Sequence, residues 1–405
     1  MNYAVKSIYG KIRNKKAVVA VPGSKSITAR AMLLAALAEG VSTLYGAQLS
    51  DDCLTFLNAL KSLGIDIKAE GEIITIRGCG GRLPVKRAEV YVGSAGTAAR
   101  FLTALTALSE GEFTLYSSEQ MKARPQMPLI AAIEDMGVGF TFLNEPYCFP
   151  FTVKGSRNFA DEITVDVSKS SQFLSALLMC AVCAGKPVIV NTVGSHGMDY
   201  VNMTLDMMWS FGVPVEEIDG AYKVSGKYVA KKYDIEPDVS AACYFYALNK
   251  VLGTQVSVRA VTPHTMQGDY KFIRLIENFD GGEVDMSAFS DQALTMAAIA
   301  PFFSNPTLIK GIAHVRGQEC DRIKAACINL TAMGVPVEER EDGFKIYPAR
   351  PHAAHINTFG DHRVAMSFAL TGLRTEGIVI ENAEVCSKTF KDYFSVLDKL
   401  IAQLT

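Results

Sequence analysis

Apolar residues recur along the chain in a pattern that changes repeatedly from helical to strand spacing. Four times, an apolar run with helical spacing ends at a glycine and is followed by two strand-like runs around a polar turn. The glycines that end these runs are Gly64, Gly137, Gly212 and Gly334. The second strand of each copy is expected at residues 73–77, 149–153, 222–224 and 344–347. The pattern therefore predicts an α/β unit that is repeated along the chain.

The spacing of these glycines indicates six units rather than four. The interval between Gly212 and Gly334 is longer than the others, and residues 278–286 form a degenerate copy within it. A C-terminal helix expected at 392–404 closes a sixth unit that lacks a trailing hairpin. A chain of 405 residues exceeds the usual size of one hydrophobic core, so we expect two domains of three units each. Helices that enter from the same end would direct many N-termini into one cleft.

Five of the expected helix starts carry small, hydroxyl or basic side chains, each with an Arg or Lys nearby. They lie at residues 22–30, 93–100, 168–172, 319–322 and 360–363. Helix starts present unpaired N–H groups and the positive end of the helix dipole, so a helix gains nothing from a cation there. The cations therefore predict bound anions. The first start, from Pro22 to Arg30, lacks the upstream glycine of a nucleotide P-loop, which argues against ATP.

Composition limits the partners that such anions can belong to. The formal net charge is -2, so no overall field attracts nucleic acid or a membrane surface. The N-terminus has no signal-like apolar region and no run of eighteen apolar residues occurs, so we expect a cytoplasmic protein. Nine cysteines lie mostly in apolar segments, as reduced core thiols do, and Cys180-Ala-Val-Cys183 has no second pair with which to bind zinc. We expect no metal and no cofactor.

Nine short motifs occur in an order that resembles the enolpyruvyl transferases of the shikimate pathway. They are Pro22-Gly-Ser-Lys-Ser with Arg30, Leu49-Ser-Asp-Asp52, Gly96-Thr-Ala with Arg100, Arg124-Pro125, Ser170-Ser-Gln-Phe173, Ser290-Asp291, Glu319-Cys-Asp-Arg322, Asp361-His-Arg363 and Ser387-Lys-Thr-Phe390. The resemblance spans nearly the whole chain. It implies two lobes of three inverse βαβαββ units each, an inside-out α/β barrel with the active site in the cleft between the lobes. Residues 21–235 would form one lobe, and residues 1–20 with 236–405 the other.

The resemblance also implies the substrates and the residues that bind them. Such a protein is an enzyme that transfers the enolpyruvyl group of phosphoenolpyruvate to the 5-hydroxyl of shikimate 3-phosphate; it acts as a monomer on these two small molecules. Shikimate 3-phosphate would contact Lys25, Ser26, Arg30, Ser170, Ser171, Gln172, Ser195, Asp291 and Gln318. Phosphoenolpyruvate would contact Lys25, Gly96, Arg124, Gln172, Arg322, Arg363 and Lys388.

Two carboxylates and one lysine would carry the chemistry. Asp291 is expected to accept the proton of the attacking hydroxyl, and Glu319, with Lys25, to deliver a proton to C3 of phosphoenolpyruvate. Each has a simpler structural interpretation: Asp291 as the N-cap of a helix at 294–303, and Glu319 as an ordinary acidic residue in a first helical turn. Arg124 and Lys388 are alternatively solvated surface charges.

Several positions depart from the family pattern. Ala29 stands where Asn or His is usual, Gln318 replaces a lysine, and Ser94 replaces an asparagine. The stretch 194–200 around Ser195 is also off pattern. These departures bear on the affinity for shikimate 3-phosphate more than on the reaction class.

Three other functions fit parts of the sequence. A related transferase that acts on a UDP-sugar would carry a reactive cysteine near 110–120, and residues 109–120 hold none. A catalytically silent anion-binding relative is compatible with Gln318 and Ala29. RNA processing on a related repeat fold is disfavoured, because basic and aromatic residues are not interleaved.

Overall fold

The computed structural model describes residues 1–124 and 126–405, so Pro125 of the Arg124-Pro125 motif lies outside the described residues. The chain divides into two compact units, each of which is described by itself. The first unit is Gly23–Glu236, and the second unit combines Met1–Pro22 with Pro237–Thr405. These limits lie within two residues of the expected lobes at 21–235 and at 1–20 with 236–405.

The first unit contains three four-stranded sheets with one topology. In each sheet, two parallel strands are followed by an antiparallel pair, in the orders β14-β3-β5-β4, β6-β7-β9-β8 and β10-β11-β13-β12. The strands are β3 (Glu39–Tyr45), β4 (Asp66–Glu70), β5 (Ile73–Cys79), β6 (Arg87–Tyr91), β7 (Gly111–Tyr116), β8 (Gly139–Phe142), β9 (Phe151–Gly155), β10 (Glu162–Asp166), β11 (Val188–Val193), β12 (Val215–Ile218), β13 (Ala221–Val224) and β14 (Lys232–Asp234). The helices are α1 (Lys25–Leu37), α2 (Asp51–Ser62), α3 (Gly96–Ala107), α4 (Glu119–Lys122), α5 (Met127–Asp135), α6 (Gln172–Cys180), the 3-10 helix η1 (Ala181–Ala184) and α7 (Met198–Ser210).

The second unit repeats this topology once in full and twice in shortened form. Its sheets have the orders β16-β17-β19-β18, β15-β2 and β1-β21-β20. The strands are β1 (Tyr3–Ala4), β2 (Lys16–Val19), β15 (Gln255–Val258), β16 (Gly282–Asp285), β17 (Thr307–Lys310), β18 (Val337–Arg340), β19 (Gly343–Ile346), β20 (Ala354–Ile356) and β21 (Ile378–Ile380). The helices are α8 (Val239–Leu252), α9 (Tyr270–Asn278), η2 (Ser287–Gln292), α10 (Ala293–Ile299), η3 (Ala300–Phe302), η4 (Ala313–Gly317), α11 (Arg322–Ala332), α12 (His362–Arg374), η5 (Ala383–Lys388) and α13 (Tyr393–Leu404). Among the described residues, each unit thus holds three sheets, as the repeat predicts.

The repeated glycines end their helices in one common way. Gly64 has a φ of +83°, its N–H donates to Lys61 O, and the N–H of Ile65 donates to Leu60 O. This pair of hydrogen bonds is the Schellman motif, which requires a left-handed residue that glycine adopts without strain. The same two bonds and a positive φ occur at Gly137, Gly212 and Gly334. Each glycine leads into the first strand of an antiparallel hairpin, so the predicted helix–glycine–hairpin unit is confirmed.

The degenerate copy at 278–286 has a different structure from the one expected. Helix α9 ends at Asn278, and Gly282 begins strand β16, which pairs in parallel with β17. No hairpin follows this segment, because Ser287 begins a 3-10 helix instead. Gly281 and Gly282 lead into the first strand of a repeat unit. They do not end the second helix of a unit.

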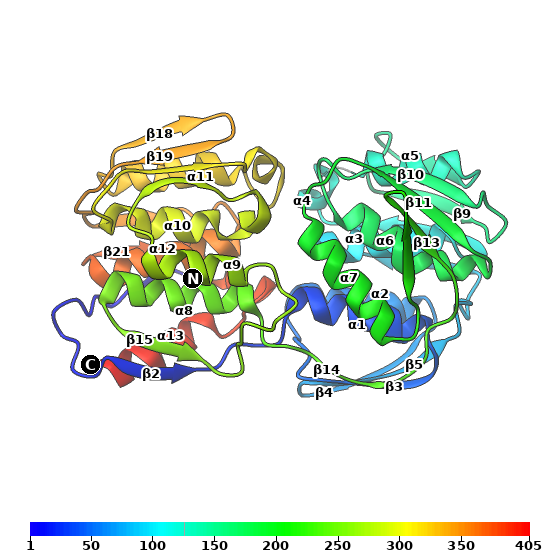
Figure 1. Cartoon of the computed structure of the whole chain (residues 1–405), viewed down its shortest axis with the longest axis horizontal. Coiled ribbons are helices and arrows are strands. Elements are labelled where there is room, and N and C mark those ends of the chain that lie inside the picture. Colours follow the sequence, from blue (N-terminus) through cyan, green and yellow to red (C-terminus); the bar gives the residue numbers. More distant parts are fainter. Residues whose placement is uncertain (125) are drawn as a thin grey trace. The chain divides into compact units, whose positions relative to one another are not determined.

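Buried helices form the core of each unit, and the sheets lie outside them (Figure 1). In the first unit α3 packs against α1 and α6, and every residue of α6 except Gln172 is buried. In the second unit α8, α10 and α12 pack against one another, and all of α12 except Arg374 is buried. Because the central helices are buried on all sides, a ligand can reach them mainly near their ends. The helix N-termini therefore determine where a site can form.

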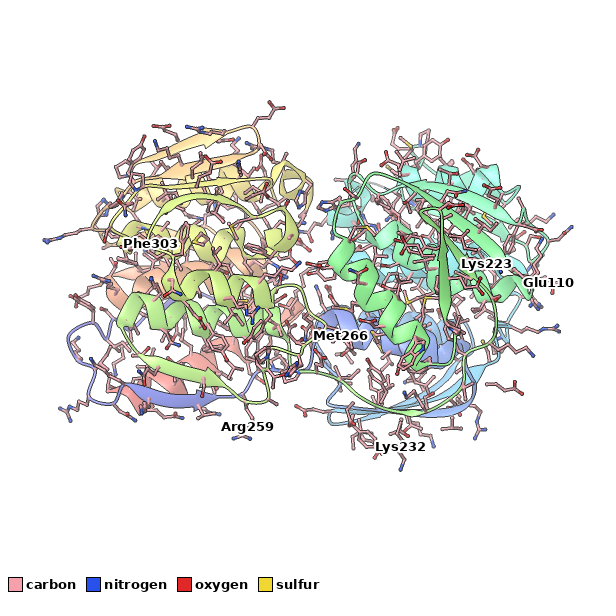
Figure 2. All side chains as sticks on the ribbon, viewed as in Figure 1. Glu110, Lys223, Lys232, Arg259, Met266 and Phe303 are labelled. Carbon is pink, nitrogen blue, oxygen red and sulfur yellow. The ribbon has the colours of Figure 1, made fainter. Side chains whose placement is uncertain are left out.

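The outward strands carry ion pairs at the surface. Lys223 of β13, labelled in Figure 2, pairs with Glu216 of β12 at 3.1 Å, and both side chains are exposed. No helix in the described part of the chain is long and apolar enough to cross a membrane.

Candidate active site

Helix α1 begins at Lys25, within the first motif, so this motif forms the helix start itself. Ser24 is the N-cap, and its hydroxyl accepts a hydrogen bond from Ile27 N at 3.4 Å. A Cβ on Gly23 would lie 1.9 Å from Gly46 O, so the preceding loop packs where only glycine fits. Lys25 is consequently the first residue of the helix, at the positive end of its dipole.

An acidic residue of the second motif orients Lys25. Asp52 is buried at the start of α2, and its Oδ2 lies 3.2 Å from Lys25 Nζ. The lysine side chain is 20% exposed, so it is partly accessible to solvent. An ammonium group has three donors, which allows Lys25 to bind an anion while Asp52 holds it.

Arg30 is buried without a carboxylate partner among the described residues. Its Nε donates to Thr204 Oγ1 at 2.8 Å, while its Nη atoms donate to Ser26 O, Tyr200 O and Ser175 Oγ at 3.1, 3.2 and 3.4 Å. Burial lowers the pKa of Arg30 to about 10, so the guanidinium remains charged at neutral pH. A buried charge with only neutral partners is costly, and a nearby anion would offset that cost.

Gly96 lies where three polar side chains converge. A Cβ built on Gly96 would be 3.0 Å from Gln172 Oε1, 3.1 Å from Arg124 Nη2 and 3.2 Å from Arg100 Nη1. Gly96 is the first residue of α3 and does not have a positive φ, so backbone conformation does not require glycine there. The glycine instead leaves room beside these side chains, as expected for a position where a ligand approaches the backbone.

We expect Gly96→Ala to weaken phosphoenolpyruvate binding by about tenfold or more while leaving the fold stable. The added methyl group displaces the ends of Arg124 and Gln172, yet alanine is favourable in a helix. Calorimetric titration of each substrate, together with a melting curve, tests this. Equal losses for both substrates with a lowered melting temperature would show a purely structural role.

The serines expected around shikimate 3-phosphate lie next to one another. Ser170 Oγ accepts from Gln172 N at 3.3 Å, and Ser171 is the N-cap of α6 with no side-chain capping bond. A Cβ on Gly197 would lie 2.6 Å from Ser171 Oγ, so the segment that holds Ser195 packs closely against α6. Ser195 itself is exposed.

In the second unit, Arg322 is the centre of an ion-pair cluster. It is the first residue of α11 and is 3% exposed. Its Nε donates to Asp361 Oδ2 at 2.8 Å, its Nη1 to Asp291 Oδ1 and its Nη2 to Glu319 Oε2, both at 3.0 Å. Although burial disfavours the charge of Arg322, the carboxylates, Asp361 foremost, raise its pKa above the ordinary value. Nη1 also donates to Gln318 Oε1.

Asp291 bridges two arginines. Its second oxygen, Oδ2, accepts from Arg363 Nη2 at 2.8 Å, and its side chain is 22% exposed. Asp291 lies within η2, whereas the N-cap of α10 is Gln292. The interpretation of Asp291 as a helix cap is therefore wrong.

Glu319 and Lys388 also differ from their simpler interpretations. Glu319 precedes the N-cap of α11, Asp321, so it is not in the first helical turn. Its Oε1 lies 3.8 Å from Lys388 Nζ, and the lysine is buried, not solvated. The structure thus brings Asp291, Gln318, Glu319, Arg322, Arg363 and Lys388 into one cluster.

This cluster corrects one step of the sequence argument. The cations near the helix starts of the second unit do not lack protein partners, since Arg322 and Arg363 contact carboxylates of the chain. Any anion that binds to these guanidinium groups would compete with Asp291 and Glu319 for them. The sequence could not show this, because the partners lie up to about seventy residues apart.

Arg316 fixes the segment that carries Gln318 and Glu319. Its Nη1 donates to both oxygens of Asp321 at 3.1 and 2.8 Å and to Glu339 of β18 at 2.8 Å. Its Nη2 and Nε donate to the carbonyls of Arg340 and Glu341 at 2.6 and 3.1 Å. The forked guanidinium thereby ties η4 to the β18–β19 hairpin.

We expect Arg316→Met to lower the free energy of unfolding by about 1–2 kcal/mol and to reduce turnover, because several charge-assisted hydrogen bonds are lost from a partly exposed site. Arg340→Met is the matched control, since Arg340 makes one exposed ion pair, with Glu338 at 3.6 Å, and should cost less than about 0.5 kcal/mol. Urea denaturation of both variants measures the difference. Equal destabilisation would contradict the role given to Arg316.

Some of these contacts involve residues to which sequence analysis gave no role. Asp52 and Asp361 stood in the quoted motifs, but nothing in the sequence showed that they pair with Lys25 and Arg322. Thr204 and Ser175 lie within apolar helices and gave no signal at all. Arg100 is buried, and its Nη1 lies 3.4 Å from Gly96 O, where it supports the segment around Gly96.

Comparison with known proteins places these residues in a family context. The family model described as EPSP synthase (3-phosphoshikimate 1-carboxyvinyltransferase) matches residues 10–397. A protein of Trichormus variabilis named 3-phosphoshikimate 1-carboxyvinyltransferase is 39% identical, with 96% of this chain and 97% of that protein covered. One of Halalkalibacterium halodurans, named 3-phosphoshikimate 1-carboxyvinyltransferase 2, is 35% identical, with coverages of 95% and 92%.

A solved structure supports the fold. The EPSP synthase of Acinetobacter baumannii has a TM-score of 0.82 and 22% identity, with 98% of each chain covered. This likeness confirms the predicted α/β class and the two-lobed architecture of inverse βαβαββ units.

Proposed function

The chain belongs to the EPSP synthase family, and we propose that it transfers the enolpyruvyl group of phosphoenolpyruvate to the 5-hydroxyl of shikimate 3-phosphate, releasing phosphate. The observation that carries this proposal is the match along nearly the entire chain, which includes every segment that holds an expected site residue. The reaction belongs to the shikimate pathway of aromatic amino acid biosynthesis. We further propose that the enzyme acts in the cytoplasm as a monomer.

Both units contribute cations in this proposal. Phosphoenolpyruvate is held by Lys25, Gly96, Arg124 and Gln172 of the first unit and by Arg322, Arg363 and Lys388 of the second. Shikimate 3-phosphate is held by Lys25, Ser26, Arg30, Ser170, Ser171, Gln172, Ser195, Asp291 and Gln318. Arg30 supports this assignment, because a buried guanidinium with neutral partners favours a nearby phosphate or carboxylate.

The proposed chemistry uses two carboxylates in sequence. Asp291 accepts the proton of the 5-hydroxyl while the hydroxyl oxygen bonds to C2 of phosphoenolpyruvate. Glu319 delivers a proton to C3. The tetrahedral adduct then loses the proton from C3 to Glu319 and expels phosphate from C2. Arg322 and Lys388 contact Glu319. They stabilise the Glu319 carboxylate that remains after the proton has been delivered to C3.

Phosphate release tests this function directly. The protein mixed with both substrates should release phosphate at a rate proportional to enzyme, and omission of shikimate 3-phosphate should abolish release. Binding of both anions without release would indicate a silent anion-binding protein. Release with a UDP-sugar, but not with shikimate 3-phosphate, would indicate the related transferase.

A further inference from the structure

Asp269 is a buried carboxylate that the proposed reaction leaves without a role. It stands at the N-cap position of α9, yet its side chain makes no capping hydrogen bond. Its Oδ2 instead accepts from Ser240 of α8 and, at 3.1 Å, from Gln292 Nε2, the residue that follows Asp291. Figure 2 labels Met266, three residues before Asp269, on the loop that leads into α9.

The loop before Asp269 is held rigidly to the start of α8. Gln267 Oε1 accepts from Val239 N at 3.0 Å, and Gln267 Nε2 donates to Pro237 O at 2.8 Å. On the other side, Thr295 Oγ1 donates to Gln292 Oε1 at 3.1 Å. The carboxylate of Asp269 therefore has a fixed position relative to the segment that carries Asp291.

The charges around Asp269 are few. Within the described residues Asp269 forms no ion pair, and its hydrogen-bond donors are the neutral Ser240 and Gln292. Asp291 of η2 and Arg363 of α12 are the charged groups that act on it, and Cys243 of α8 adjoins it. Burial, followed by the charge of Asp269, raises the pKa of Cys243, so this thiol stays neutral.

The interaction between the two carboxylates has a definite sign. Burial and then the charge of Asp291 raise the pKa of Asp269 above its ordinary value of 3.8. The coupling is reciprocal, so an ionised Asp269 increases the proton affinity of Asp291. Arg322 and Arg363, in direct contact with Asp291, have the opposite effect.

We propose that Asp269 is a positioning residue for the base: its buried negative charge offsets the two arginines on Asp291 and so strengthens Asp291 as a proton acceptor. This inference rests on the proposed function. With two arginines bound to it and no other charge nearby, Asp291 would be a weak base. The carboxylate of Asp269, held through Gln292, restores the proton affinity of Asp291. The effect acts only when Asp269 is ionised, which happens as the pH rises through its raised pKa.

The test compares pH profiles of kcat/KM for the wild type and Asp269→Asn, an isosteric variant that imitates a permanently protonated Asp269. At about pH 8 the wild type should exceed the variant by about three- to tenfold, and at about pH 5 the two should agree within about twofold. A loss that is equal at every pH would show a merely structural role and overturn the inference. Wild-type protein that releases no phosphate would instead overturn the proposed function, so the two failures are distinguishable.

Ser240→Ala is the matched control, because it removes a hydrogen bond to Asp269 but keeps the ionisable group. Its profile should keep the wild-type inflection, moved to higher pH, since a donor that favours the charged form is lost. Loss of the inflection in Ser240→Ala would contradict the assignment to Asp269. Should Asp269→Asn fail to fold, Asp269→Ser provides a smaller neutral side chain, and the pH profile of its kcat/KM is judged by the same criterion.

Discussion

Asp291→Asn should lower turnover by at least about a hundredfold and leave phosphoenolpyruvate binding unchanged or tighter. The loss follows from the removal of the base that takes the hydroxyl proton. The binding effect follows from the ion pairs, because Asp291 contacts Nη atoms of both Arg322 and Arg363. Without this negative charge, the two guanidinium groups attract a substrate carboxylate more strongly. Steady-state kinetics and calorimetric titration with phosphoenolpyruvate measure the two effects separately.

Asp285→Asn provides the control for Asp291→Asn. Asp285 lies at the end of β16, where its Oδ1 accepts from Ser287 N at 2.9 Å, in the same part of the chain but outside the ion-pair cluster. The turnover of Asp285→Asn should stay within about twofold of the wild-type turnover. Near-normal turnover of Asp291→Asn would show that another group is the base, and weaker phosphoenolpyruvate binding would show that Asp291 does not compete with the substrate.

The repeat could be predicted from the sequence because its signals are local. The Schellman ends at Gly64, Gly137, Gly212 and Gly334 depend on a glycine and on hydrogen bonds within six residues. The hairpins that follow alternate apolar and polar positions, which a sequence displays directly. The prediction for 278–286 was wrong, because its two glycines lead into strand β16 and do not end a helix before a hairpin. Only the pairing of β16 with the distant strand β17 reveals this difference.

The ion-pair cluster could not be predicted, because its members meet only through folding. Asp291, Glu319 and Asp361 belong to three separate segments of the chain, and the sequence does not say which of their oxygens face Arg322. The quoted motifs contain Asp291, Glu319, Arg322, Asp361, Arg363 and Lys388, but they do not show which of these residues form pairs. Whether a cation is free or already paired depends on the packing of α10, α11 and α12. Asp269 gave no signal because an aspartate before a helix normally indicates only a cap.

Glu319→Gln should likewise lower turnover by at least about a hundredfold, but at the proton transfer to C3. Glu319 is 8% exposed, with Arg322 Nη2 at 3.0 Å and Lys388 Nζ at 3.8 Å, so it is a carboxylate held between cations. Glutamine has nearly the same shape and keeps a carbonyl that can accept from Arg322, yet it cannot carry the proton. The fold should remain intact.

Isotope incorporation at C3 tests the role given to Glu319. In deuterated water the wild type should place deuterium at C3 of the enolpyruvyl group, because a deuteron from an exchangeable carrier is added there to form a methyl group, and any one of the three methyl hydrogens can be lost when phosphate leaves. Glu319→Gln should incorporate at least about a hundredfold more slowly, in step with its turnover. Glu341→Gln, at an exposed residue of the β18–β19 hairpin, should incorporate at the wild-type rate. If Glu319→Gln retained rapid incorporation while losing turnover, the proton carrier at C3 would have to be another residue, and Lys25 would be the first candidate, since it is a titratable group with a partly exposed side chain.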